Sequence, residues 1–154
     1  MLETPHVALG AAIAIKIPNP FIAIPLAFAS HFLLERVPHW NPHLNTETKK
    51  YGRPTKQTTL IVIIDASVSL LLGSYFASQA LPNTMQTANV LLCSFASVLP
   101  DLLEAPYFFF GVRHKFFETW IKWQKAIQVD TTPFWGIITQ IVTLAATLFW
   151  IFRG

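Results

Sequence analysis

TTLIVIIDASVSLLLGSYFAS, residues 58–78, is the stretch that decides the fold. Its only charged residue is Asp65, and the rest of the run is apolar or weakly polar. A transmembrane helix needs about 20 consecutive, mostly apolar residues, because it must cross about 30 Å of hydrocarbon while satisfying its own backbone hydrogen bonds. The stretch therefore predicts a membrane-spanning α-helix.

Further apolar segments lie on both sides of this helix, separated by proline, asparagine and glycine. We predict an all-α fold, an integral membrane helical bundle of about five apolar helices plus one interfacial amphipathic helix, in a single membrane-embedded domain covering residues 1–154. Thr4-Pro5 is typical of an N-cap followed by a first helical residue. The apolar helices are expected over residues 6–17, 21–37, 58–78, 84–110 (with Pro100 and Pro106 inside) and 133–151.

Composition agrees with a membrane location. Hydrophobic residues make up 53% of the chain and charged residues 12%, against about 25% charged residues in soluble domains. The net charge of +3 is spread over short segments and does not form a nucleic-acid footprint. Cys93 is the single cysteine, which excludes an internal disulfide. The N-terminus does not resemble a cleavable signal peptide, because Glu3 is acidic and no Lys or Arg precedes the first apolar run.

Residues 113–127 have a different pattern. Phe116, Trp120, Trp123 and Ile127 fall at helical spacing on one face, and lysines occupy other positions of the same segment. A basic helix with an aromatic stripe is typical of a helix that lies in the membrane interface. We therefore expect this helix to lie on the membrane without crossing it.

The positions of Lys and Arg predict the orientation in a cell membrane. Residues 38–57, expected to be an irregular loop, carry Lys49, Lys50, Arg53 and Lys56, and residues 113–125 are also basic. Short basic loops stay in the cytoplasm. We expect both segments and the N-terminus to be cytoplasmic, and the uncharged 79–83 turn to face outward.

Several ionisable residues lie where the chain should be buried in hydrocarbon. His31, Glu35, Asp65 and Asp101 fall inside apolar helices, and His6 and His39 lie at helix ends. Such groups are costly unless they are paired or hydrated, and they commonly mark functional sites. No central Lys or Arg neutralises the carboxylates. A proton or a metal ion is the simplest counter-charge.

The predicted depths of these residues agree with one another. Asp65 lies nine residues after Lys56, about 13 Å along a helix, and Asp101 is similarly far from the inner end of its helix. His31 and Glu35 are four residues apart and share a helix face. All six candidates therefore converge on the cytoplasmic half of the membrane.

Imidazole and carboxylate side chains are ligands for divalent ions, with zinc or manganese the best candidates here. One or two ions held by His6, His31, Glu35, His39, Asp65 and Asp101 could support hydrolysis. Glu35 or Glu104 would act as general base on water. A site reached from the bilayer suggests a lipid, or another amphipathic ester or phosphoester, as substrate.

Four segments stand out in about the first forty residues: Pro5-His6, Gly10–Ile13, Asn19-Pro20 and Ala29–Trp40. Together they resemble a known family of small membrane-bound metal-dependent hydrolases that includes the LexA-binding inner-membrane hydrolases. Leu99-Pro100-Asp101 resembles the family's Leu-Pro-Asp element, although Leu102-Leu103-Glu104 follows where the family has Asp-His. The resemblance implies a multi-helix inner-membrane hydrolase with His6, His31, Glu35, His39 and Asp101 at its metal site.

Two other classes of function fit the same residues. Acids and histidines in a hydrated bundle also serve ion or proton transporters and channels. A noncatalytic membrane scaffold could use His31 and Glu35 as a hydrogen-bonded pair that stabilises a helix hairpin. His43 and His114 are more typical of a loop and of a headgroup contact, respectively.

Overall fold

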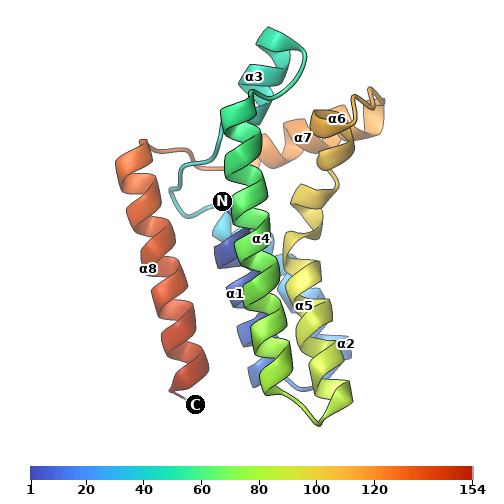
Figure 1. Cartoon of the computed structure of the whole chain (residues 1–154), viewed down its shortest axis with the longest axis vertical. Helices are drawn as coiled ribbons and strands as arrows, with labels where there is room; N and C mark the ends of the chain where they lie inside the picture. Colours follow the sequence, from blue (N-terminus) through green and yellow to red (C-terminus); the bar gives the residue numbers. More distant parts are fainter. Residues whose placement is uncertain (154) are drawn as a thin grey trace.

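The computed structural model describes residues 1–153 and is all-α, with eight helices in this range. Figure 1 shows the long helices running side by side, with the short ones gathered at one end. The helices are α1 (Glu3–Lys16), α2 (Pro20–Leu34), α3 (Leu44–Tyr51), α4 (Lys56–Gln79), α5 (Thr84–Leu102), α6 (Ala105–Phe109), α7 (Lys115–Ile127) and α8 (Pro133–Phe152).

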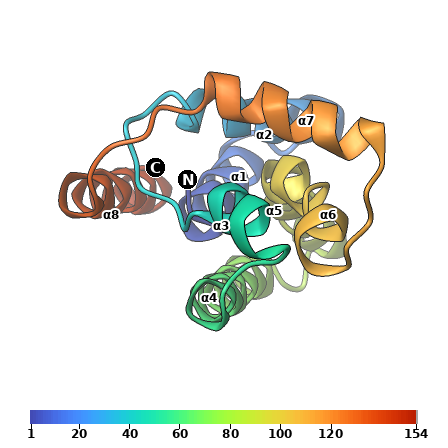
Figure 2. The same ribbon diagram turned by 90° about the horizontal axis from the view of Figure 1, so that it is seen from above.

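Helix α1 is the centre of the bundle, with α2, α4, α5 and α8 around it (Figure 2). Its small residues, Gly10, Ala11, Ala12 and Ala14, are all buried. A Cβ added at Gly10 would lie 2.5 Å from the Cys93 carbonyl oxygen, so α5 packs directly on the α1 backbone. Close approach of this kind is what small residues permit between apolar helices.

The two ends of the bundle differ. In Figure 1, α3, α6 and α7 lie at the end where α4 begins, and the turns joining α1 to α2 and α4 to α5 lie at the other. The basic segments 49–56 and 113–125 therefore share one end, as their predicted common side of a membrane requires. Between the two ends lies an apolar core that includes Ala14, Ala27, Phe76 and Val90.

Helices α4 and α8 are long and apolar enough to cross a membrane, with mean hydropathies of 2.0 and 1.7. Only 22% and 17% of their apolar windows are buried, whereas the core helix of a soluble protein would be mostly buried. Leu70, Leu71, Phe134 and Ile141 are among the large apolar side chains that they expose. Two such helices indicate membrane association, and the crossing of α1, α2 and α5 stays a prediction.

The prediction of an irregular loop over residues 38–57 is wrong in part, because α3 forms within it. Gly52 ends α3 with a left-handed φ of 78°, and its N–H donates to the Thr48 carbonyl oxygen at 2.9 Å. Glu47 links α3 to the start of α4, since its carboxylate accepts from Thr55 N at 2.7 Å and from the Thr58 hydroxyl at 2.8 Å.

The predicted helix over residues 84–110 is divided in two. Helix α5 contains Pro100 but ends at Leu102, and α6 starts at Ala105. Pro106 explains the break, because proline has no N–H to donate to the Leu102 carbonyl as a continuous helix would require. The break places Glu104 between the two helices.

Candidate metal centre

Three helices bring four of the six predicted ligands together. His6 lies in the first turns of α1, His31 on α2, Glu35 at the C-terminal cap of α2, and Asp101 near the end of α5. Each offers a ligand atom within 4.8 Å of those of the others. The three histidine and glutamate side chains are buried, and Asp101 is 25% exposed. These four residues, the metal cluster below, could hold a metal ion.

The orientation of His31 suits a ligand. Its Nδ1 lies 2.9 Å from the Ser97 carbonyl oxygen, which can only accept, so Nδ1 carries the proton. Its Nε2 then faces Asp101 Oδ1 at 3.5 Å and Gln124 Oε1 at 3.2 Å. Two oxygen acceptors beside an imidazole nitrogen call for a positive charge at this place, either a proton on Nε2 or a metal ion. Fixing of Nδ1 by a backbone carbonyl is the usual support for a metal-binding histidine.

Glu35 lies between His6 of the cluster and His39. Its Oε1 lies 3.3 Å from His6 Nε2, its Oε2 lies 3.5 Å from His39 Nε2, and the amino group of Met1 also contacts Oε1. The His6 and His31 rings stack with centroids 4.2 Å apart. Ligands about 2.1 Å from a tetrahedral ion lie about 3.4 Å apart. The separation of His6 from Glu35 is close to this value, whereas other separations within the cluster extend to 4.8 Å.

His39 lies behind Glu35 and is oriented by other residues. Its Nδ1–H donates to the Val37 carbonyl at 2.7 Å, and its Nε2 accepts from Gln128 at 3.0 Å and from Asn41 at 3.3 Å. Burial lowers the pKa of His39 and favours the neutral ring. Its Nε2 is thus engaged by two amide donors while it lies 3.5 Å from Glu35 Oε2, and the predicted role of His39 as a ligand remains a prediction.

The backbone around His39 is fixed by the segment after α7 and by α8. His39 N donates to the Val129 carbonyl and Thr131 N donates to the His39 carbonyl, both at 3.0 Å, forming an isolated parallel bridge. A Cβ added at Gly136 would lie 2.5 Å from Trp40 Cβ and 2.8 Å from the His39 carbonyl carbon. The absence of a side chain at Gly136 therefore allows α8 to pack directly on the backbone of His39 and Trp40.

Asp65 lies outside the metal cluster, at the start of α1. Its carboxylate accepts from Glu3 N at 2.5 Å and from the Thr4 hydroxyl at 2.6 Å. Helix α1 starts at Glu3, earlier than the predicted Thr4-Pro5 cap, and Leu2 at its N-cap position provides no side-chain hydrogen bond. Asp65, which belongs to α4, caps the first turn of α1 in place of Leu2. It is not one of the four residues of the metal cluster, so its predicted role as a ligand stays a prediction.

Glu104, predicted as a general base, lies beside Asp101 at the same cleft. Its Oε1 accepts from Gln124 Nε2 at 3.0 Å. Burial, with a further contribution from the charge of Asp101, raises the pKa of Glu104 to about 8. The cleft has a volume of about 420 Å³ and is also lined by Glu3, Glu35 and Asp65.

Two residues at the site were missed by the sequence analysis. Gln124, on α7, is buried and donates through Nε2 to both Asp101 and Glu104 at 3.0 Å, while its Oε1 faces His31. The second residue is Glu3, whose buried Oε2 has no hydrogen-bond partner in residues 1–153. The buried Nδ1 of His6 also lacks a partner there. These orphaned atoms fit a site that takes a cation. The sequence offered one signal for Gln124: it lies four residues after Trp120 and so shares a face of the helix with it.

Comparison of the chain with protein-family models, with curated proteins and with solved structures gave no match. What the chain binds is therefore inferred from the metal cluster and the cleft around it.

Proposed function

We propose that the protein is a membrane-embedded, metal-dependent hydrolase that acts on a lipid, or another amphipathic ester or phosphoester, at the cytoplasmic leaflet. One observation carries the proposal: ligand atoms of His6, His31, Glu35 and Asp101 all lie within 4.8 Å of one another. Electron pairs brought together in a buried place call for a positive ion.

Glu35 forms an ion pair with the amino group of Met1, whereas the only basic group that Asp101 contacts in residues 1–153 is the imidazole of His31. In residues 1–153, no Lys or Arg side chain forms an ion pair with Glu35 or Asp101. Lys125 lines the same cleft, but it contacts Asp130. Two imidazoles and two carboxylates are a suitable ligand set for zinc or manganese, with one or two ions.

The residues around the cluster suit hydrolysis. A divalent ion would polarise a carbonyl or phosphoryl oxygen and make water easier to deprotonate. Glu104 lies beside Asp101, and its raised pKa of about 8 suits a group that would take a proton from water once it is ionised, while Gln124 orients both carboxyl groups. Glu35 is the alternative base if it does not bind the ion directly.

The surroundings suggest an amphipathic substrate. The cleft combines the acidic groups with apolar residues, Leu102, Phe108 and Ile121 among them. It lies toward the bundle end that carries the basic segments, which we assign to the cytoplasm. Membership of the LexA-binding inner-membrane hydrolase group, proposed from the resemblance of residues 5–40, agrees with this assignment.

A hydrolase fits better than a transporter because of what lies beyond the cluster. The centre of the bundle between the cluster and the 79–83 turn contains buried apolar residues such as Ala14, Val90 and Cys93. The buried polar side chains of α5 are few there, and Asn89 is used by the Ile17 and Pro18 carbonyls. A channel or proton relay needs polar groups or water along its whole length. The site is instead a cleft with an apolar floor.

Metal content of the purified full-length protein tests the proposal. We expect zinc or manganese to be retained by the wild type, and His31→Ala and Asp101→Asn each to reduce metal content by more than half. His114→Asn is the matched control, because His114 caps α7 away from the cluster and asparagine keeps a capping group.

A wild type that stays metal-free after incubation with zinc and manganese would remove the metal site, and with it the hydrolase. If metal binds, hydrolysis of short-chain ester and phosphoester probes in detergent tests the reaction. Metal flux into liposomes, in the absence of hydrolysis, would favour a transporter.

A further inference from the structure

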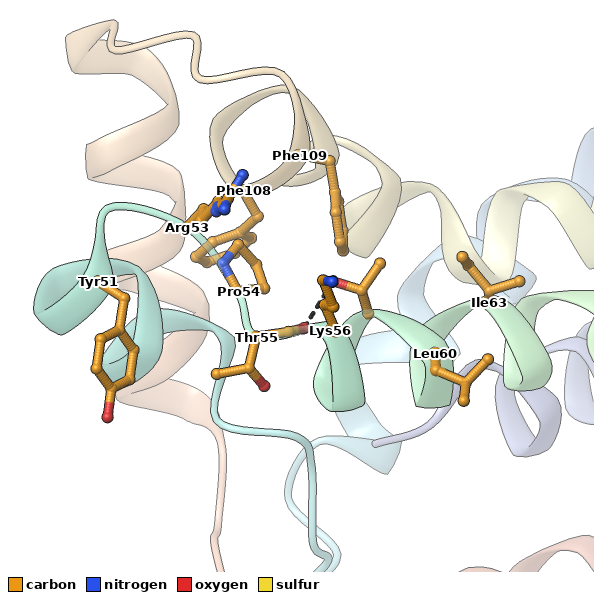
Figure 3. Close-up of a pocket in the computed structure, with 10 residues that line it drawn as sticks. Tyr51, Arg53, Pro54, Thr55, Lys56, Leu60, Ile63, Phe108 and Phe109 are labelled. Atoms are coloured by element: carbon orange, nitrogen blue, oxygen red, sulfur yellow. Dashed lines mark hydrogen bonds between the residues drawn. The ribbon is translucent and has the colours of Figure 1, made fainter.

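A second cavity, of about 560 Å³, lies between the start of α4 and α6. Phe108 and Phe109 line both this cavity and the cleft beside the metal cluster. Arg53 and Lys56 lie at one end of this cavity, and Leu60 and Ile63 line it farther along α4. In Figure 3 the ring of Phe109 extends from α6 toward α4. The cavity thus has a basic end and an apolar end.

The two cations at this cavity are available to a ligand. Arg53 and Lys56 are exposed, and neither forms an ion pair with an acid among residues 1–153. The carboxylate of Glu47 is engaged by Thr55 and Thr58. Lys56 is the first residue of α4, where a cation opposes the helix dipole, so its own helix gives it no compensation.

The apolar end continues along a helix long enough to cross a membrane. Lys56, Leu60 and Ile63 follow at spacings of four and three residues, so they share one face of α4. Leu60 and Ile63 are 56% and 57% exposed. A molecule with an anionic head and an apolar chain along the helix axis would match this order of groups.

We propose that this cavity binds one anionic phospholipid, with its phosphate at Arg53 and Lys56 and an acyl chain along Leu60, Ile63 and Phe109. Basic pockets at the cytoplasmic ends of membrane helices recognise lipid headgroups in this way. The proposal rests on the membrane location given under the proposed function, but it requires neither metal nor hydrolysis.

Lipid retention by the full-length protein tests the proposal. Protein purified in detergent is mixed with equal amounts of phosphatidylglycerol and phosphatidylcholine of the same chain length, and bound lipid is counted by native mass spectrometry. We expect one phosphatidylglycerol to be retained in preference. Each basic residue near an anionic surface contributes about 1 kcal/mol, so Arg53→Gln with Lys56→Gln should reduce that preference about tenfold or more.

The control variant, Lys115→Gln with Lys122→Gln, removes the same charge from exposed positions on α7. An equal loss in this control would show nonspecific attraction and overturn the proposal. Displacement of the lipid by millimolar glycerol phosphate would overturn it too, since it would show a free-anion site. Metal content, measured in the same samples, should stay unchanged in both variants, which separates a failure here from a failure of the hydrolase.

Discussion

The Nδ1–H of His31 donates to the carbonyl oxygen of Ser97 at 2.9 Å and so connects α2 to α5 at the metal cluster. A histidine held this way has one free nitrogen and one direction for it. Because the acceptor is backbone, its position is set by the path of α5 and not by a side-chain rotamer. The same contact therefore determines both where the two helices meet and which atom faces Asp101.

Gln124 should act on metal affinity without being required for the fold. We expect Gln124→Leu to weaken metal binding about 10–100-fold, because Asp101 and Glu104 lose their common donor. Competition with a chromophoric chelator measures the change. Gln128→Leu is the comparison, since Gln128 contacts His39 and not the cluster. A larger effect at Gln128 than at Gln124 would contradict the arrangement.

Asp65 should matter mainly for stability. Asp65→Ala removes the cap of α1, and we expect it to destabilise the protein by about 1–3 kcal/mol. The folded fraction should keep the metal content of the wild type. Ser67→Ala, on an exposed part of the same helix, should change stability little. Loss of metal from well-folded Asp65→Ala protein would instead make Asp65 a ligand.

Gly136→Ala should displace the backbone at His39. The new methyl group would overlap with His39 and Trp40, and overpacking of this kind costs about 1–3 kcal/mol. We expect lower thermal stability together with weaker metal binding. Gly73→Ala is the matched control on α4, where the added Cβ would meet Val7 at 3.2 Å and Ser94 at 3.4 Å. Equal losses from both substitutions would contradict a special role for Gly136.

The junction of α3 and α4 should weaken in acid. Hydrogen bonds from Thr55 and Thr58 lower the pKa of Glu47 from its ordinary value of 4.5. A carboxylate with a lowered folded pKa stabilises the fold fully above pH about 4.5, and this contribution is lost as pH falls through the folded value. The protection factor of the Thr55 amide, which corrects for the pH dependence of intrinsic exchange, should therefore fall below pH about 4.5. Glu47→Gln should remove most of this pH dependence. If the variant keeps the same dependence of Thr55 protection on pH as the wild type, Glu47 is not its cause.

Thiol labelling can test the predicted orientation. Cys93 is fully buried, so the wild type should react little with maleimides. We expect Gln79→Cys to react with a membrane-impermeant maleimide in intact cells, and Lys50→Cys only after the cells are opened. Both side chains are exposed and lie near opposite ends of α4. Labelling of both from the same side would contradict the topology.

Local sequence signals predicted the long helices well. The apolar run 58–78 became α4 over Lys56–Gln79, and the starts near Thr84 and Pro133 were correct. Proline and asparagine mark such boundaries within a few residues of the helix itself. The polar helix α3 was missed because its support comes from Glu47 contacting Thr55, a contact that periodicity does not reveal.

Part of the candidate site was predictable, because helical spacing and predicted depth in the membrane are both local properties of the sequence. His31 and Glu35 share a face by spacing, and the estimated depths linked them to His6 and Asp101. Gln124 could not be found this way, because the pattern of α7 favoured a helix lying on the membrane surface. Phe32 packs edge-on against Trp120 and Trp123, with centroids 6.5 and 5.1 Å apart. This packing holds α7 against α2, and Gln124 reaches the cluster from there.

The buried N-terminal end of α1 has a consequence for the order in which the chain can fold. Its first backbone N–H groups are satisfied by Asp65 of α4 and by Gln140 of α8, whose Oε1 accepts from Leu2 N at 2.8 Å. Helix α1 precedes both partners along the chain, yet its hydrogen bonding is complete only once they have arrived. A ribosome-bound fragment ending before residue 133 should therefore leave Leu2 N without its partner at Gln140.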